Sequence, residues 1–175
     1  MIGMRYWLDT EFLDNGDGPI HLLSIGLVAG DGREYYAVNA DCPLEQANDW
    51  VREHVLPQLH RPLSIPSRAV PKRQLREEVF AFIQAGGPGP EFWGYMVAYD
   101  WVVFCQLFGT MQEFPEDWPK YCRDVRQWAD FLGSPPLPLQ NEGHHHALWD
   151  ARWTRQAWEY LNRVQGAGCR VQETN

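Results

Sequence analysis

Hydrophobic residues near the start of the chain fall in short runs that are separated by turn-forming residues. The runs are residues 5–9 (RYWLD), 21–29 (HLLSIGLVA) and 33–39 (REYYAVN). Runs of this length that are rich in aromatic and β-branched residues are typical of strands. The segments 14–19 and 30–32 between them are rich in glycine and aspartate, which is typical of tight turns. The pattern predicts an antiparallel meander of three strands.

After Pro43 the spacing of apolar residues becomes helical, with recurrences three and four positions apart. Pro71 suits the first turn of a helix, because its fixed φ fits there and its missing N–H is not needed. The pattern predicts one further strand and five helices: a strand over residues 91–99, and helices over residues 44–56, 71–86, 100–108, 121–132 and 144–163. A meander followed by alternating helices and strands predicts an α/β (or α+β) domain in which helices cover a mixed sheet.

One domain accounts for the whole chain. A length of 175 residues suits a single hydrophobic core, and the sequence contains no internal repeat. We therefore expect one domain over residues 1–165. Residues 166–175 are polar and contain glycine, so we expect them to form a loose C-terminal tail.

The composition is that of a globular protein, with 45% hydrophobic and 22% charged residues. No apolar run reaches the roughly 18–20 residues that span a bilayer. Residues 1–8 lack the charged start and apolar stretch of a signal peptide. We therefore expect a cytoplasmic protein with no membrane association. The cysteines lack zinc-site spacing and are expected to be free thiols; they are Cys42, Cys105, Cys122 and Cys169.

The net charge of −8 bears on which nucleic acids the chain could bind. It argues against a protein that coats long duplexes by neutralising many phosphates. It does not argue against an enzyme that binds only a terminus, because divalent cations bound to carboxylates offset their charge locally.

Carboxylates and one histidine stand where predicted strands end or helices begin. Asp9 and Glu11 are two positions apart in an extended segment, so their side chains leave the same face. Asp100 follows the aromatic run that starts at residue 91, and Asp150 lies in the last helix, five residues after His145. Burying such carboxylates is costly unless they are paired or bind a metal.

These residue types suit metal-assisted hydrolysis of a phosphodiester. The reaction needs a nucleophilic water, charge stabilisation at phosphorus and help for the leaving oxygen, which two cations about 3.5–4 Å apart can supply. Mg²⁺ and Mn²⁺ prefer oxygen ligands, and a histidine can accept the proton of the water. Each residue alone has an ordinary explanation: a solvated Asp-x-Glu pair, a helix cap at Asp100, or an exposed histidine run over residues 144–146.

Taken in order, these residues resemble the motifs of the DEDD exonuclease superfamily. Residues 9–12 (DTEF) resemble the first motif and Tyr99-Asp100 the second. Residues 145–151 (HHALWDA) resemble the third in the H-x4-D form that marks the DEDDh subgroup. Over roughly residues 4–160 the chain also resembles the actinobacterial polyadenylate-specific exoribonucleases (RNase AS), in the runs DGREYYAV at 31–38, WVREHVLP at 50–57 and AYDWVVFCQLFG at 98–109.

The resemblance implies a ribonuclease H-like exonuclease fold, with a mixed central sheet flanked by helices. It implies a 3′→5′ exoribonuclease that releases nucleoside 5′-monophosphates from single-stranded RNA, prefers adenylate-rich 3′ ends and forms a homodimer. His145 would be the general base, and Phe12 and Leu13 would contact the terminal nucleotide. Two Mg²⁺ ions, which Mn²⁺ can replace, would be held by Asp9, Glu11, Asp100 and Asp150.

Two alternatives use the same fold. A DNA 3′→5′ exonuclease needs the same five residues, since none of them distinguishes a 2′-hydroxyl from hydrogen. A non-catalytic RNA-binding relative would be expected to lack an acid or the histidine, and none is missing here.

Two further groups of residues have competing interpretations. The tryptophans at positions 149, 153 and 158 suit packing or an interface better than base stacking. The basic residues at positions 68, 72, 73 and 76 could contact phosphates or simply form a solvated helix face.

Overall fold

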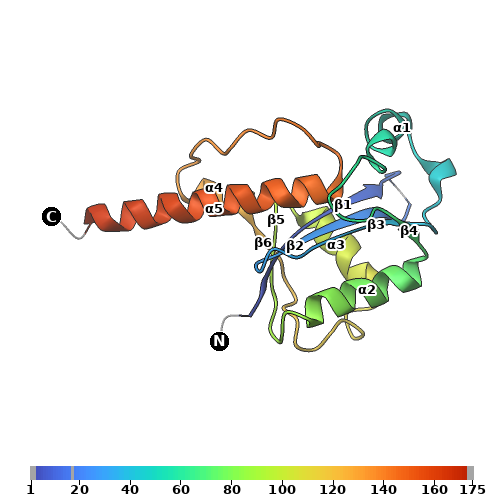
Figure 1. Ribbon diagram of the computed structural model, residues 1–175, viewed down its shortest axis with the longest axis horizontal. Coiled ribbons are helices and arrows are strands. Elements are labelled where there is room, and N and C mark those ends of the chain that lie inside the picture. The colour runs from blue at the N-terminus through green and yellow to red at the C-terminus, as the bar shows by residue number, and fades with distance from the viewer. Residues whose placement is uncertain (1–2, 17, 173–175) are drawn as a thin grey trace.

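The computed structural model describes residues 3–16 and 18–172 of the chain. Figure 1 shows a sheet with helices on both faces and one long helix that extends past the sheet. The strands within the described residues are β1 (Arg5–Leu13), β2 (His21–Ala29), β3 (Glu34–Asn39), β4 (Ala69–Val70), β5 (Glu91–Gly94) and β6 (Arg123–Asp124). The helices are α1 (Asp49–His54), α2 (Lys72–Gln84), α3 (Ala98–Leu107), α4 (Val125–Phe131) and α5 (Ala147–Gln172), with short 3-10 turns η1 (Leu44–Gln46) and η2 (Leu56–Gln58).

The strands form one mixed sheet in the order β4-β3-β2-β1-β5-β6. β1 pairs with β2, and β2 with β3, in antiparallel register, which confirms the predicted meander. The remaining pairs, β1 with β5, β3 with β4 and β5 with β6, are parallel. The expected mixed α/β architecture is therefore confirmed.

Side chains alternate between the two faces of the sheet, as the pleat requires. Tyr6 and Leu8 of β1 pack with α2 and α3 on one face. Trp7 and Leu13 pack with α1 and the start of α5 on the other. Since Asp9 and Glu11 have the same parity as Trp7, their side chains leave β1 on the α5 face.

Gly26 sets how closely α5 approaches the sheet. It pairs with Asp9 across the β1–β2 ladder. A Cβ atom at Gly26 would lie 2.4 Å from the carbonyl carbon and oxygen of Ala147 and from the amide nitrogen of Leu148. The missing side chain thus lets the first turn of α5 pass directly over β2 beside Asp9.

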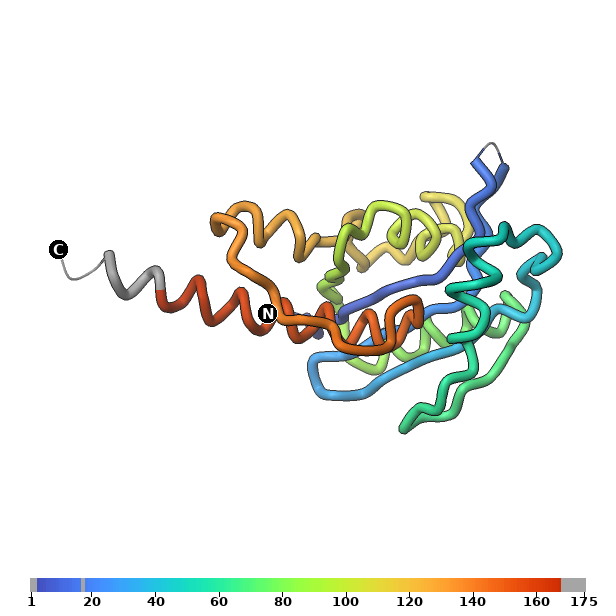
Figure 2. Tube along the Cα trace, turned by 90° about the horizontal axis from the view of Figure 1, so that it is seen from above, coloured from blue at the N-terminus to red at the C-terminus, as the bar shows by residue number. Residues whose placement is uncertain are grey.

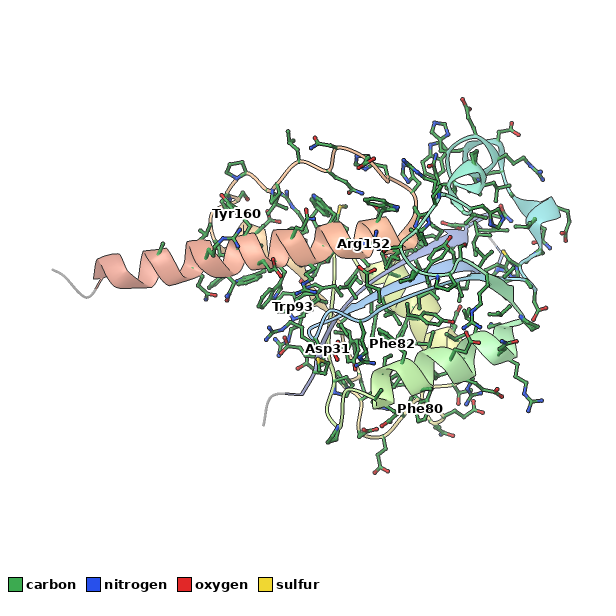
Figure 3. All side chains as sticks on the ribbon, in the orientation of Figure 1. Asp31, Phe80, Phe82, Trp93, Arg152 and Tyr160 are labelled. Carbon is green, nitrogen blue, oxygen red and sulfur yellow. The ribbon has the colours of Figure 1, made fainter. Side chains whose placement is uncertain are left out.

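α5 is also fixed farther along its length. Arg152 donates to both carboxylate oxygens of Glu34 in β3, at 2.8 and 2.6 Å. Trp158 packs edge-on against Trp7, with ring centroids 5.4 Å apart, and against Trp93 of β5, with centroids 6.0 Å apart. Figure 3 shows Trp93 beside α5. Trp153 packs edge-on against Tyr95 at 4.8 Å. The packing interpretation is confirmed for Trp153 and Trp158.

The C-terminal prediction needs correction. α5 begins at Ala147 rather than at residue 144, because His145 has a φ of 62°, which an α-helix does not accept. α5 is described as far as Gln172, and Figure 2 shows its coloured part extending past the sheet. A loose attachment of residues 166–175 stays a prediction. Residues 173–175 lie outside the described residues.

Other element boundaries also differ from the prediction. β5 ends at Gly94 instead of residue 99, because Asp124 accepts hydrogen bonds from the amides of Met96 and Val97 and turns the chain into α3. The helix predicted over 121–132 is divided into β6 and α4, whose N-cap is Asp124. The helix predicted over 44–56 is divided into η1, α1 and η2, and the two-residue strand β4 lies in a segment expected to be a loop.

Cys42, Cys105 and Cys122 are free thiols, as expected, and the side chain of Cys169 is not among those described. No helix in the described part of the chain is both long enough and apolar enough to cross a membrane.

Candidate active site

Three carboxylates converge from two elements that are distant in the sequence. Asp9 and Glu11 come from β1, and Asp150 comes from the first turn of α5. One oxygen atom of each lies within 4.8 Å of the others. Glu11 is only 9% exposed, whereas Asp9 and Asp150 remain partly accessible. The structure therefore brings together three of the four predicted metal ligands.

Asp100 reaches the same region from the opposite face of the sheet. It lies in the first turn of α3 and is 9% exposed. Its Oδ1 accepts hydrogen bonds from the amide and the hydroxyl of Thr10, at 2.9 and 2.7 Å. The Thr10 amide is available because β5 pairs with β1 only as far as Trp7. Asp100 is thus tied to the residue between Asp9 and Glu11, outside the group of three.

The carboxylates raise one another's pKa. The pKa values of Asp9 and Glu11 lie well above the usual range, first because of burial and then because of repulsion from neighbouring acids. Burial also raises the pKa of Asp100 and Asp150, although hydrogen bonds from Thr10 and Gln140, respectively, act in the opposite direction. Low-dielectric surroundings and like charge both disfavour the ionised forms.

Within the described part of the chain, the acid cluster has no cationic side chain paired with it. None of the ion pairs found among the described residues includes Asp9, Glu11, Asp100 or Asp150. A donor set made only of carboxylate oxygens is the set that hard divalent cations such as Mg²⁺ and Mn²⁺ prefer. The residues therefore fit a divalent metal centre.

His145 faces the same hollow as two of the acids. A cavity of ≈560 Å³ is lined by Asp9, Asp150 and His145 and by Tyr95, Pro138, Leu139, Gln140, His144, Trp153 and Thr154. Gln140 donates a 2.5 Å hydrogen bond to Oδ1 of Asp150, and the His146 amide donates to its Oδ2 at 3.2 Å. The base predicted from the sequence is therefore adjacent to the predicted ligands.

The neighbouring histidines have different positions. His146 is fully buried and stacks on Tyr36 with ring centroids 4.3 Å apart, and burial lowers its pKa to about 4. Its Nδ1 accepts a hydrogen bond from the Leu148 amide at the start of α5. His144 is exposed, with Nε2 2.9 Å from the carbonyl oxygen of Gln140. His146 therefore has the contacts of a structural core residue, whereas His145 lines the cavity that contains the acids.

The side chains of the two residues expected to contact the terminal nucleotide lie in different environments. Phe12 is half-buried and stacks on Tyr99, with ring centroids 5.8 Å apart and planes 12° from parallel. Leu13 is 1% exposed and belongs to the core, which leaves only its main chain for a ligand. Tyr99 is 54% exposed and was not singled out from the sequence, although its place before Asp100 in the second motif was the available signal.

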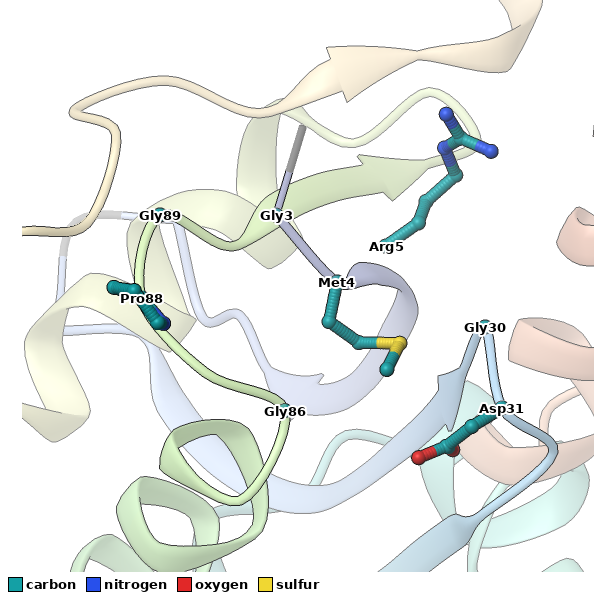
Figure 4. Close-up of a pocket in the computed structure, with 8 residues that line it drawn as sticks. All are labelled: Gly3, Met4, Arg5, Gly30, Asp31, Gly86, Pro88 and Gly89. Atoms are coloured by element: carbon teal, nitrogen blue, oxygen red, sulfur yellow. The ribbon is translucent and has the colours of Figure 1, made fainter. Parts of the chain in front are cut away.

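A larger hollow lies at the start of β1, away from the carboxylates (Figure 4). It measures ≈850 Å³ and is lined by Gly3, Met4, Arg5, Gly30, Asp31, Gly86, Pro88 and Gly89. Arg5 is paired with Glu91 at 2.6 Å and Asp31 with Arg33 at 2.7 Å. With its charged side chains already paired, this hollow offers less to a metal or phosphate than the carboxylate site does.

Two of the four residues in the predicted basic cluster form ion pairs on the same surface. Arg68 pairs with Glu78 at 2.7 Å, and Arg73 pairs with Glu77 at 3.2 Å. Both acids are on α2. This pairing favours the interpretation of a solvated helix face over a phosphate track.

Comparison with known proteins places the chain among exoribonucleases. Residues 4–162 match the family model described as the 3′-5′ exoribonuclease Rv2179c-like domain. The chain is 40% identical over 166 residues to the 3′-5′ exoribonuclease Rv2179c of Mycobacterium tuberculosis H37Rv, covering 94% of this chain and 97% of the relative. It has the same identity and coverage with the 3′-5′ exoribonuclease MT2234.1 of M. tuberculosis CDC 1551.

Solved structures share the fold at low sequence identity. A structure of exonuclease I has a TM-score of 0.61 and 13% identity, covering 93% of this chain and 42% of the other. E. coli exonuclease I in complex with a dT13 oligonucleotide has a TM-score of 0.60 and 12% identity, covering 98% and 44%. The chain thus spans less than half the length of these neighbours. The ribonuclease H-like exonuclease fold expected from the resemblance is confirmed.

Proposed function

We propose, from the premise that this chain belongs to the Rv2179c-like 3′-5′ exoribonuclease family, that Asp9, Glu11, Asp100 and Asp150 form its metal-binding active site and that His145 is its general base. The observation that carries the proposal is the convergence of Asp9, Glu11 and Asp150, whose ligand atoms lie within 4.8 Å of one another.

The family resemblance implies a role for each acid. Asp9, Glu11 and Asp150 would hold one ion, and Asp9, shared with Asp100, would hold the second. When bound, the two ions, which we take to be Mg²⁺ replaceable by Mn²⁺, neutralise charge on the scissile phosphate and make a water more acidic. Thr10 keeps Asp100 oriented through its two hydrogen bonds.

His145 accepts the proton of the attacking water, since it shares the cavity with Asp9 and Asp150. Attack on the last phosphodiester from the 3′ end then releases a nucleoside 5′-monophosphate and leaves a 3′-hydroxyl on the shortened strand. Gln140 and the His146 amide hold the Asp150 carboxylate, so the main chain next to His145 keeps a fixed position relative to Asp150.

The substrate is a single-stranded RNA 3′ end, and we propose a preference for adenylate. The exposed ring of Tyr99 stacked on Phe12 offers an aromatic surface next to the acids, on which a terminal base can stack. The Phe12 role expected from the sequence is thereby extended to Tyr99, and the Leu13 role is limited to its main chain. The adenine preference and the homodimer rest on the family resemblance, and the cytoplasmic location remains a prediction from the sequence.

The test is degradation of 5′-labelled oligo(A), oligo(U) and oligo(dA) of one length, with Mg²⁺, with Mn²⁺ and with EDTA. We expect a ladder that shortens from the 3′ end, requires metal and forms fastest on oligo(A). Asp150→Ala, folded by circular dichroism, should give no ladder. Equal rates on oligo(A) and oligo(U) would remove the adenine preference, and equal rates on oligo(A) and oligo(dA) would favour the DNA exonuclease alternative.

A further inference from the structure

The main chain around His145 is firmly held on both sides. His145 itself has a φ of 62°, a left-handed conformation that is unfavourable in a residue other than glycine. The preceding residue contacts Gln140 through the His144 ring. The following residue is held by the buried His146 ring and by its amide, which donates to Asp150. The backbone therefore aims the His145 side chain in one direction.

The ring of His145 is held by much less. Its aromatic neighbours among the described residues are His144, with ring centroids 6.3 Å apart, and Trp50, with centroids 4.9 Å apart and planes at 83°. The Trp50 contact is the closer one and has the edge-to-face geometry that aromatic pairs favour. A backbone-fixed histidine can still rotate about its side-chain bonds, and Trp50 limits that rotation.

Trp50 is itself well supported although it is half exposed. It is 51% exposed and lies in the first turn of α1. Its ring stacks on His54, one turn later, with centroids 5.1 Å apart and planes 5° from parallel. The Asn48 side chain caps α1, and Val51 packs into the same core cluster as Ala147 and Leu148 of α5. Trp50 is therefore fixed relative to the start of α5.

We propose that Trp50 is a positioning residue that holds the His145 imidazole in the orientation for proton acceptance. This rests on the proposed function, in which His145 is the general base. Half of the Trp50 surface is exposed beside the active site, an arrangement that core packing alone does not require. Trp50 would raise the turnover rate without contributing to RNA binding, because its effect passes through His145.

The test is a mutant cycle between the two residues. Trp50→Ala should lower kcat on oligo(A) about 10-fold, a fraction of the 10²–10⁴ expected of a general base, and change KM by less than about 2-fold. Trp50→Phe should recover most of kcat. In a His145→Ala background, measured by single turnover with excess enzyme, Trp50→Ala should have no further effect, as expected for residues that act through one another.

Phe131→Ala is the matched control for loss of an exposed aromatic ring, since Phe131 is 83% exposed on α4, and should leave kcat unchanged. If Trp50→Ala does not fold, His54→Ala removes the ring that supports Trp50. It should lower kcat about 2- to 3-fold, and again not in the His145→Ala background.

Three results would overturn the proposal. The first is an unchanged kcat in both Trp50→Ala and His54→Ala. The second is a raised KM with an unchanged kcat in Trp50→Ala, which would make Trp50 a base-stacking residue. The third is an equal loss of rate from Trp50→Ala in the presence and absence of His145. Full activity of His145→Ala alone would instead refute the general-base assignment, so the two failures are distinguishable.

Discussion

Replacing Gly26 with alanine should separate the two halves of the active site. The new Cβ would lie 2.4 Å from three backbone atoms of Ala147 and Leu148. Ordinary contact begins near 3.4 Å, so the first turn of α5 would have to retreat by about 1 Å. That turn carries Asp150, while Asp9 stays on β1 opposite Gly26.

Two effects of different size follow. Overpacking of this kind costs about 1–3 kcal/mol in the free energy of unfolding, which a folded domain can survive. A displacement of about 1 Å in a catalytic group can lower the rate about 10²-fold. Because Asp150 moves relative to Asp9, we expect the loss of activity to be much larger than the loss of stability suggests.

The assay is kcat on 5′-labelled oligo(A) at saturating metal, measured well below the melting temperature of the variant. Gly166→Ala is the control, because Gly166 lies on the same helix and nothing is within 4 Å of its added Cβ. It should keep full activity and be slightly more stable, by up to about 1 kcal/mol. Wild-type kcat in a folded Gly26→Ala variant would show that the close approach of α5 to β2 is not needed for catalysis.

Three further outcomes are expected. Asp9→Asn should abolish hydrolysis, because it removes a proposed metal ligand. It should also raise the melting temperature of the metal-free protein, because it removes one charge from a cluster whose acids raise one another's pKa. Residual metal-dependent cleavage would refute the ligand assignment. Because the pKa values of Asp9 and Glu11 are raised, the folded chain keeps protons that the unfolded chain has already lost, so metal-free stability should fall as pH rises from the ordinary carboxyl range through the folded pKa values. Thermal melts with EDTA between pH 4 and pH 8 test this. A saturating level of Mg²⁺, at about 100 times its Kd, should restore about 2.7 kcal/mol of stability at neutral pH. Tyr99→Ala should raise KM for oligo(A) about 10-fold with little change in kcat, since one base-stacking contact contributes about 1–3 kcal/mol. An unchanged KM would show that Tyr99 does not stack on the terminal base.

The parts of the fold that depend on local pattern could be predicted. β2 has the predicted bounds, His21–Ala29, because a continuous apolar run between turn segments is a local signal. The shared face of Asp9 and Glu11 follows directly from the period of a strand.

The parts that could not be predicted depend on contacts between distant residues. β5 stops at Gly94 because of hydrogen bonds to Asp124, about 30 positions away in the sequence. Asp100 is oriented by Thr10, which lies within the first motif but had no role assigned from the sequence. The importance of Gly26 appears only when α5 is seen to cross over it, and the contact between Trp50 and His145 joins residues that are far apart in the sequence.

The placement of the acids on both sides of one strand has a consequence for protein synthesis. Asp9, Glu11 and Asp100 emerge from the ribosome before Asp150, which reaches β1 only after α5 has docked. On the proposed ligand assignment, a nascent chain in which α5 has not yet docked therefore carries an incomplete ligand set. The appearance of metal-dependent exonuclease activity should then coincide with the docking of α5, which makes activity a readout of that folding step.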